Sequence, residues 1–344
     1  MFSRRLSGHP VCSPLHLLKS TKYKGLRAGF SSIVRRVPTR SPERPTRART
    51  QLLKPKPGQS AATPTSIKIP PNMEPIITEL RRISKFKIRS HDTSENSHIP
   101  LLHSQTKDAP ENGPTVVLIG DSMLERMLTT GKGVNFVEPW PSHAMLSEDT
   151  LGRVNLGRET KSEVTRLNRV FNAGVGGDKI QNVAYRLAGT PATDGGEGEE
   201  QERALPGLLP MLAACGTVKL WVVHMGANNL NPKRGLSATD LAALRALISA
   251  LGRVNEGKNK ILVTGLTHRK DISRELVVAA NVGIEAMVKE LDAEIGPARV
   301  LFARAPAVDT GKHLDDHVHL NLEGYRLWAE QLVVEVVDSL QVTA

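Results

Sequence analysis

Three short polar stretches of this 344-residue chain carry the side-chain types that acyl transfer requires. They are Ile119–Met123, Met225–Asn229 and Asp316–His319. A serine hydroxyl is a weak nucleophile unless a neighbouring base accepts its proton, and that base needs a third group to fix its tautomer. Ser122, His319 and Asp316 can supply the nucleophile, the base and the orienting carboxylate. Together they predict nucleophilic attack on an acyl carbon.

The spacing of Asp316 and His319 suits these roles. The two residues are three positions apart, so one helical turn would place both side chains on the same face. The carboxylate could then hold the imidazole ring in one orientation. Taken alone, His319 would be read as a surface histidine, and its pairing with Asp316 is what favours catalysis.

Two further segments offer donors for a developing oxyanion. Acyl transfer places negative charge on the carbonyl oxygen, and the loss of one preorganised donor costs about 3–4 kcal/mol. The side-chain amide of Asn228 and the backbone of Gly176 and Gly177 are the candidate donors. The glycines could equally serve a backbone conformation with positive φ, which is compatible with donating an N–H.

Five short apolar runs predict buried parallel strands. They are Val116–Ile119, Val170–Asn172, Leu220–His224, Ile261–Thr264 and Val300–Ala303. Longer segments with helical periodicity alternate with them: Lys179–Leu187, Ala238–Val254, Ile272–Ile295 and Leu322–Leu340. Strands that alternate with helices imply right-handed crossovers and an open, doubly wound parallel sheet of the α/β class.

The candidate residues fall at one edge of that predicted sheet. Ser122 follows the first strand, Gly177 the second and Asn228 the third. Asp316 and His319 precede the last helix. Ligands of such sheets bind outside the carboxyl ends of the strands, so the chemistry and the fold predict the same place.

Four blocks of the sequence resemble the motifs of the SGNH (GDSL-type) hydrolases, in that family's order and across roughly residues 115–341. They are Gly120-Asp121-Ser122, Gly177, Gly226-Ala227-Asn228 and Asp316-His317-Val318-His319. Within the family, residues 117–123 and 171–178 are most similar to the catalytic subunits of intracellular platelet-activating-factor acetylhydrolase.

The resemblance implies a flavodoxin-like three-layer α/β/α fold with a five-stranded parallel sheet. It implies Ser122 as the nucleophile, His319 as the general base and Asp316 as the residue that orients His319. The oxyanion hole would be formed by the backbone N–H of Ser122 together with Gly177 and Asn228. The implied mechanism uses no metal and no cofactor.

Other residues near these blocks have simpler interpretations. Asp121 is a supporting residue of the first block, and on its own it would be the N-cap of the helix that follows. Asp178 follows two glycines and precedes a helix, so it too is expected to be an N-cap. The histidines and carboxylates of residues 313–319 could ligate a metal. No second group with ligand spacing accompanies them in the sequence, so no metal site is expected.

The expected activity is hydrolysis of short-chain acyl esters, acetyl esters among them, on a small-molecule or lipid substrate through an acyl-enzyme. Residues 129–169 and 189–204 form loops that are longer than expected for the acetylhydrolase branch and would lie near the site. The acyl and alcohol parts of the substrate are therefore not specified. Two alternatives are a catalytically inactive SGNH-fold binding or scaffold module and a carbohydrate O-deacetylase.

Motifs typical of other enzyme classes are missing from the chain. The chain contains no Gly-x-Ser-x-Gly, which argues against the nucleophile elbow of α/β-hydrolases. It also contains no Gly-x-Gly-x-x-Gly and no complete Walker loop, so nucleotide chemistry is not indicated.

The net charge of +11 is distributed unevenly. Residues 1–110 hold 21 Lys and Arg against 6 Asp and Glu, whereas residues 111–344 hold 25 against 29. Because the basic excess belongs to the N-terminal segment, no nucleic-acid partner is expected for the catalytic part.

The N-terminal third divides into two expected segments. Residues 1–49 carry 12 basic residues and one acid, and they are dotted with Ser and Thr. They resemble a mitochondrial transit peptide, which predicts a disordered presequence and a location in the mitochondrial matrix. The alternatives are a cytoplasmic protein with a basic tail and an arm that docks on RNA or anionic lipid.

Residues 50–112 are expected to be a Pro-, Ser- and Lys-rich linker in which residues 73–89 could form a short basic helix. Residues 113–344 are expected to be the SGNH hydrolase domain.

The last predicted helix would hold the base in place. Its apolar stripe comprises Tyr325, Trp328, Leu332 and Val336, at three- and four-residue intervals, and is expected to pack on the sheet. The two cysteines, Cys12 and Cys215, cannot form a disulfide framework. No apolar run reaches the roughly 18–20 residues that a transmembrane segment requires. The oligomeric state is not specified by the sequence.

Overall fold

The computed structural model of the chain describes residues 72–106, 109–127, 140, 146–153, 169–190 and 204–341. All of them belong to one compact unit, Thr63–Ala344. The expected presequence of residues 1–49 and the following residues 50–71 lie outside the described residues. So do most of the two long loops, 129–169 and 189–204. The interpretations of these segments remain predictions.

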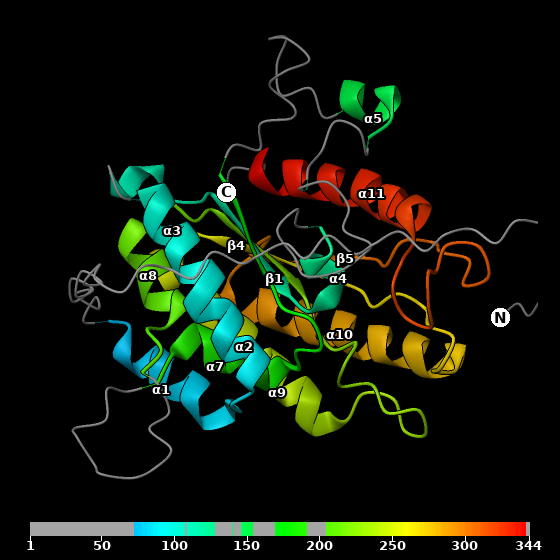
Figure 1. Cartoon of the computed structure of the whole chain (residues 1–344), viewed down its shortest axis with the longest axis horizontal. Coiled ribbons are helices and arrows are strands. Elements are labelled where there is room, and N and C mark those ends of the chain that lie inside the picture. Colours follow the sequence, from blue (N-terminus) through cyan, green and yellow to red (C-terminus); the bar gives the residue numbers. More distant parts are fainter. Residues whose placement is uncertain are drawn as a thin grey trace, which may run out of the picture. The chain divides into compact units, whose positions relative to one another are not determined.

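Five strands form one parallel sheet in the order β2-β1-β3-β4-β5 (Figure 1). They are β1 (Val116–Gly120), β2 (Val170–Gly174), β3 (Leu220–His224), β4 (Lys260–Thr264) and β5 (Val300–Ala303). This strand order is the flavodoxin-like one, so the predicted α/β fold with a five-stranded parallel sheet is confirmed. Gly120 at the end of β1 lies beside Gly174 and His224. The carboxyl ends of β1, β2 and β3 therefore meet at the same edge.

Successive residues of the strands belong to two separate cores. Val117 and Ile119 pack in one core, whereas Val116 and Leu118 pack in the other. Both faces of the sheet are covered, which is why the strands are apolar at almost every position. The apolar runs of the sequence follow from this constraint.

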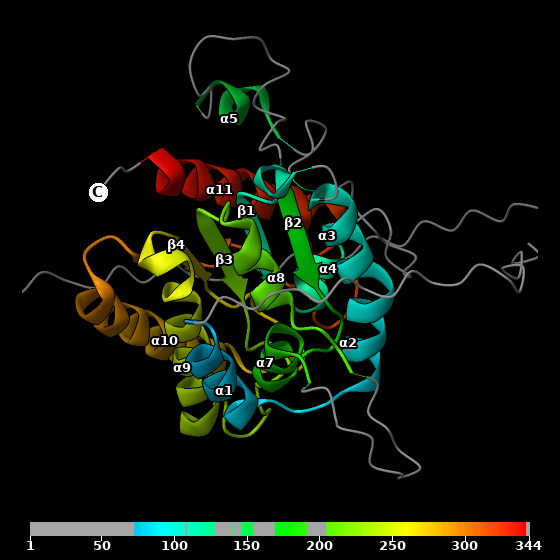
Figure 2. The same ribbon diagram turned by 90° about the vertical axis from the view of Figure 1, so that its left-hand side faces the viewer.

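The helices cover the two faces of the sheet unequally (Figures 1 and 2). One core includes residues of α7 (Ile180–Ala188), α8 (Leu208–Cys215), α9 (Ala238–Gly252) and α10 (Arg274–Ile295). The other includes residues of α4 (Ser122–Glu125), α5 (Glu148–Arg153) and α11 (Leu322–Gln341). The four helices predicted from periodicity are present, each ending within two residues of the expected position. Among the described helices, none has the length and apolarity that crossing a bilayer requires.

Residues 73–106 form an N-terminal helical arm, where a short basic helix was expected over residues 73–89 and a linker over the rest. The arm comprises α1 (Glu74–Ile83), α2 (Ile88–Thr93), the π-helical turn η1 (Ser94–His98) and α3 (Ile99–Thr106). Short 3₁₀ turns follow at η2 (Pro110–Asn112) and, after α9, at η4 (Val254–Gly257). The expectation of a linker over residues 90–112 is therefore wrong for most of that range.

The arm is helical because it has an apolar stripe to bury. Ile76, Ile77 and Leu80 of α1 are buried, and they belong to the same core as the sheet, as do Ile99 and Leu102 of α3. α1 packs against α7 and α9. The interspersed Lys and Arg residues obscure this stripe in the sequence. The packed domain consequently includes residues 73–106, and does not begin at residue 113 as expected.

Helix α11 connects the last loop of the domain to the sheet. The Asn321 side chain caps its first turn. Tyr325 and Trp328 are both 1 % exposed, and the Trp328 ring centroid lies 4.8 Å from that of His224 on β3. The Tyr325 hydroxyl donates to the carbonyl oxygen of Met123 at 3.0 Å. The predicted apolar stripe thus packs on the sheet and also contacts the start of α4.

We expect Trp328→Ala to lower the free energy of unfolding by about 3–5 kcal/mol, because it removes a fully buried indole and leaves a cavity between α11 and β3. Urea unfolding followed by circular dichroism measures this change. Leu327→Ala is the matched control, because the Leu327 side chain is 39 % exposed on the same helix. Equal destabilisation by the two substitutions would contradict the packing described here.

Candidate active site

Ser122 is the first residue of α4 and lies two positions after the end of β1. Asp121 caps this helix, and its Oδ1 accepts the N–H of Met123 at 2.9 Å. The N-cap that the sequence suggested for Asp121 is therefore present. The cap ends β1 abruptly and places the Ser122 side chain at the carboxyl edge of the sheet.

Ser122, His319 and Asp316 are in hydrogen-bond contact in that order. The Oγ of Ser122 lies 2.9 Å from Nε2 of His319, and Nδ1 of His319 lies 2.7 Å from Oδ2 of Asp316. An ionised carboxylate only accepts hydrogen bonds, so a neutral imidazole here carries its proton on Nδ1. Nε2 is then the acceptor for the Ser122 hydroxyl. The structure brings together the three residues predicted from the sequence in an arrangement suited to proton transfer.

The loop that carries Asp316 and His319 is not helical. Oδ1 of Asp316 accepts the backbone N–H groups of Val318 and His319, at 2.8 and 2.7 Å. Asp side chains favour such contacts with the following residues, and these contacts compete with helix formation. The expected helical turn is therefore wrong, although the two side chains meet. Asp316 fixes its own loop with one oxygen and the His319 ring with the other.

Burial of the His319 ring favours its neutral form. Burial lowers the pKa of His319 below 6.5, and the hydrogen bond that its Nδ1–H donates to Asp316 opposes this shift. Burial acts to raise the pKa of Asp316, but hydrogen bonds from His319 and Val318 together hold it well below its usual value. The guanidinium of Arg126, 3.8 Å from Asp316, also disfavours protonation of His319. At neutral pH the ring can therefore accept a proton from Ser122.

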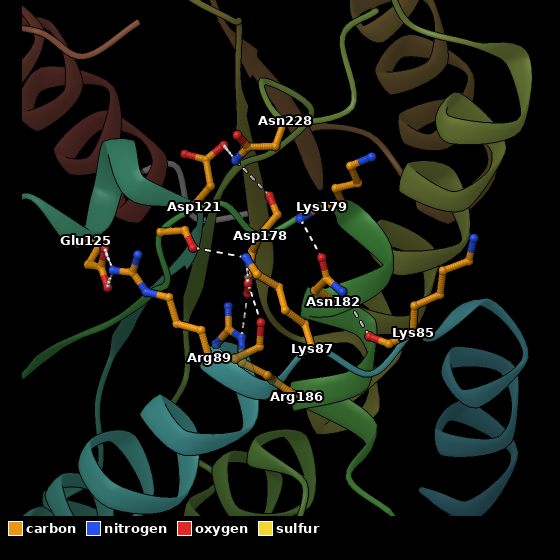
Figure 3. Close-up of polar contacts among 12 residues, drawn as sticks. Lys85, Lys87, Arg89, Asp121, Glu125, Asp178, Lys179, Asn182, Arg186 and Asn228 are labelled. Carbon is orange, nitrogen blue, oxygen red and sulfur yellow. Dashed lines mark hydrogen bonds and ion pairs between the residues drawn. The ribbon is translucent and has the colours of Figure 1, made fainter. Parts of the chain in front are cut away.

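Asn228 joins the loop of Ser122 to the loop of Gly177. Its Nδ2 donates to Oδ2 of Asp121 at 3.2 Å and to the carbonyl oxygen of Asp178 at 3.0 Å (Figure 3). Within the described part of the chain, neither the Ser122 N–H nor the Gly177 N–H has a hydrogen-bond acceptor. These two N–H groups are therefore the candidate donors to an oxyanion. The Asn228 amide would have to release one acceptor, and the longer contact with Asp121 is the weaker one.

The two glycines are required for different reasons. Gly177 has a φ of +74°, a conformation that glycine adopts without strain. A Cβ on Gly176 would lie 2.6 Å from Oε2 of Glu125 and 2.8 Å from the Arg89 guanidinium. The Arg89 guanidinium and the Glu125 carboxylate are themselves hydrogen-bonded at 2.8 and 2.9 Å. The suggested positive φ therefore applies to Gly177, whereas Gly176 allows close approach of this ion pair.

Asp178 is not the N-cap that the sequence suggested, because Lys179 occupies that position of α7. The Asp178 side chain is fully buried and accepts from Nε of Arg186 at 2.8 Å, Oγ of Ser90 at 2.5 Å and Nζ of Lys87 at 3.3 Å. A buried carboxylate needs such partners because desolvation of its charge is costly. The sequence offers little signal for this cluster, since only the fold shows that Arg186 is 1 % exposed.

The histidines and carboxylates of residues 313–319 do not converge on one point. Nδ1 of His313 accepts the N–H of Asp309 at 3.0 Å, and the His319 ring contacts Ser122. The His317 side chain is 60 % exposed. These side chains therefore serve separate contacts and do not form one ligand set.

A different group in the described residues could in principle hold a cation. His91, Asp92 and Glu95 of the N-terminal arm place three potential ligand atoms within 4.8 Å of one another. Nε2 of His91 lies 3.7 Å from Glu95, and its Nδ1 lies 2.9 Å from the hydroxyl of Tyr185. A histidine–glutamate pair one helical turn apart accounts for this arrangement.

Comparisons with known proteins add similarity in fold only. No family model matches the sequence, and no curated protein matches it. A lipase/acylhydrolase from Enterococcus faecalis is 16 % identical, with 67 % of this chain and 99 % of that chain covered and a TM-score of 0.38. A carbohydrate esterase family 3 protein from Talaromyces cellulolyticus is 16 % identical, with coverages of 67 % and 100 % and a TM-score of 0.40. A putative platelet activating factor from Streptococcus pneumonia is 16 % identical, with coverages of 72 % and 98 % and a TM-score of 0.35. The case for an activity therefore rests on the geometry of the site.

Asp121 has an unusual protonation equilibrium. Burial raises its pKa to about 7, against the hydrogen bond from the Met123 N–H, and the nearby charge of Asp178 adds to the increase. An acid whose pKa is raised on folding stabilises the protein most below its unfolded value of 3.8, and this contribution is lost as the pH rises towards 7. The ionised Asp121 carboxylate, buried next to Ser122, therefore lowers the free energy of unfolding as the pH rises.

We expect Asp121→Asn to remove this dependence. The unfolding free energy of the variant, relative to that of the wild type, should increase between pH 4 and 7 by up to about 4 kcal/mol and stay constant above that range. Urea unfolding of both proteins at a series of pH values measures the difference. Any pH-independent effect of the amide appears as a constant offset. A difference that does not vary with pH would show that Asp121 ionises normally.

Proposed function

We propose that this chain is a serine esterase that hydrolyses short-chain acyl esters through an acyl-enzyme. The observation that carries the proposal is the continuous contact from Ser122 through His319 to Asp316 at the carboxyl edge of the sheet. A hydroxyl within 2.9 Å of a neutral imidazole that is itself oriented by a carboxylate is the arrangement that activates a serine.

The first half of the reaction forms the acyl-enzyme. Oγ of Ser122 attacks the ester carbonyl carbon while Nε2 of His319 takes the hydroxyl proton. The negative charge that develops on the carbonyl oxygen is stabilised by the N–H groups of Ser122 and Gly177 and by the Asn228 amide. The C–O bond to the alcohol then breaks, and His319 gives its proton to the departing oxygen. Asp316 remains ionised throughout and stabilises the imidazolium.

The second half releases the acid. A water molecule takes the place of the alcohol, and His319 removes its proton as the water attacks the acyl carbon. The bond between the acyl carbon and Oγ of Ser122 breaks, and the proton returns to Oγ. The proton transfers in both halves are supported by the hydrogen-bond contacts of Ser122, His319 and Asp316.

The similar structures agree with an ester substrate in their printed descriptions, which name an acylhydrolase and carbohydrate esterases. The short acyl group of the proposal comes from the resemblance of residues 117–123 and 171–178 to acetylhydrolase subunits. Purified protein assayed on a panel of acetyl, butyryl and octanoyl esters, and on acetylated sugars and lipids, would assign the two parts of the substrate.

We expect Ser122→Ala to reduce hydrolysis of p-nitrophenyl acetate by at least about 10³-fold, because the variant has no nucleophile. Its melting temperature should stay close to that of the wild type. Ser104→Ala is the matched control, since the Ser104 side chain is exposed on the arm and its hydroxyl donates to the Leu101 carbonyl oxygen. Equal rates for Ser122→Ala and the wild type would reject the proposal, including the general base role of His319.

The rate should fall on the acid side as His319 becomes protonated. We expect the midpoint of kcat/KM to lie below pH 6.5, because burial lowers the pKa of His319. Asp316→Asn should move the midpoint to lower pH still, since Asp316 raises that pKa. It should also lower kcat by about 10³–10⁴-fold through loss of the correct tautomer. An acid limb that is unchanged in Asp316→Asn would contradict the assignment of His319 as the base.

A further inference from the structure

The N-terminal arm reaches the loop that carries the proposed oxyanion donor Gly177. Lys85 joins the arm to α7 by two hydrogen bonds, from its N–H to the Gln181 carbonyl oxygen and from the Asn182 amide to its own carbonyl oxygen, both at 3.0 Å. These contacts fix the chain two residues before Lys87. The Lys87 side chain then extends towards Asp178 (Figure 3).

Lys87 binds this loop directly. Its Nζ donates to the carbonyl oxygen of Gly176 at 3.0 Å and to the Asp178 carboxylate at 3.3 Å. A Cβ placed on Gly177 would lie 3.0 Å from the same nitrogen. The ammonium group is therefore packed against the peptide unit that joins Gly176 to Gly177. Its side chain is 29 % exposed, so the charge is partly shielded from water.

Because the peptide bond is planar, the contact of Lys87 with the Gly176 carbonyl oxygen also affects the N–H of Gly177. The Gly176 carbonyl and the Gly177 N–H belong to one rigid plane and point in opposite directions. A cation that holds the carbonyl oxygen therefore also sets the direction of the N–H. A charge-assisted hydrogen bond to the carbonyl polarises the peptide as well, which makes the N–H a stronger donor. Glycine on both sides of the bond would otherwise allow other orientations.

We propose that Lys87 is a positioning residue for the oxyanion hole: it holds the Gly176–Gly177 peptide so that the Gly177 N–H points at the oxygen on which charge develops. This inference rests on the proposed esterase function. It gives the N-terminal arm a role in the reaction, although the arm precedes every motif that identified the site.

Removal of the Lys87 ammonium group should leave the fold intact. The Asp178 carboxylate keeps Arg186 and Ser90 as partners when Lys87 is removed. The arm keeps its apolar contacts with the core and the two hydrogen bonds of Lys85. Loss of the ammonium group should therefore leave the fold intact while the peptide loses its anchor.

The test compares Lys87→Met with Lys85→Met and Lys87→Arg. Lys85→Met removes the same charge from the same arm, and the exposed Lys85 side chain points away from the loop (Figure 3). Each protein is assayed with p-nitrophenyl acetate and with its thionoester, in which sulfur replaces the carbonyl oxygen. Sulfur accepts hydrogen bonds weakly, so the thionoester gains little from oxyanion donors. The ratio of the two rates does not depend on how much of the protein is folded.

For Lys87→Met we expect kcat on the oxygen ester to fall about 10–100-fold with KM within about twofold of the wild-type value. The oxygen-to-thionoester rate ratio should fall by a similar factor. Lys87→Arg should recover most of the activity, and Lys85→Met should match the wild type. A wild-type rate ratio in Lys87→Met would overturn the inference.

A Ser122→Ala variant in the same assay separates failure of the Lys87 inference from failure of the esterase proposal. If Ser122→Ala is inactive while Lys87→Met retains the wild-type kcat and rate ratio, the inference about Lys87 fails and the esterase proposal stands. If Ser122→Ala retains the wild-type rate, both fail. If Ser122→Ala is inactive and the rate ratio of Lys87→Met falls, both are supported.

Discussion

The hydrogen bond between Ser122 and His319 is the interaction on which the rest of the site depends. It joins residues 197 positions apart, one from the start of the helix that follows the first strand and the other from the loop before the last helix. Neither residue could reach the other without the parallel sheet, which brings the carboxyl ends of its strands to one edge, and without α11, which packs on that sheet. Tyr325 contributes from α11 by donating to the carbonyl oxygen of Met123. The hydrophobic packing of the domain thus holds Oγ of Ser122 and Nε2 of His319 2.9 Å apart at the carboxyl edge of the sheet.

The other side of the site is held by buried charge. Asp178 is fully buried, accepts from Arg186, Ser90 and Lys87, and uses its own carbonyl oxygen to bind the Asn228 amide. Removal of Arg186, the fully buried cation of this cluster, would be costly, so the carboxylate is held firmly in place. A preorganised oxyanion hole requires this property, because donors that must reorient during the reaction lose much of their benefit. Asp121 adds a second carboxylate nearby, and burial raises its pKa to about 7.

The sequence was sufficient to predict the sheet and the contact of the triad residues, and insufficient for what supports them. Strands buried on both faces appear as continuous apolar runs, which is why all five were found close to their bounds. The order of the motifs along an α/β chain then places Ser122 near Asp316 and His319. The Asx-type loop at Asp316 was mistaken for a helical turn, because spacing alone does not distinguish them. The roles of Asp178 and Lys87 depend on partners from other elements, and the apolar stripe of the arm was obscured by its basic residues.

The central claim is that Ser122 acts as a nucleophile because His319 and Asp316 activate it. Mass spectrometry of the protein after treatment with a fluorophosphonate tests this activation, because the reagent bonds to an activated serine far faster than to an ordinary one. The account predicts a single adduct on Ser122 in the wild type and no adduct in a folded His319→Ala variant. A folded wild-type protein that stays unmodified, or a label on Ser122 that persists without His319, would contradict it.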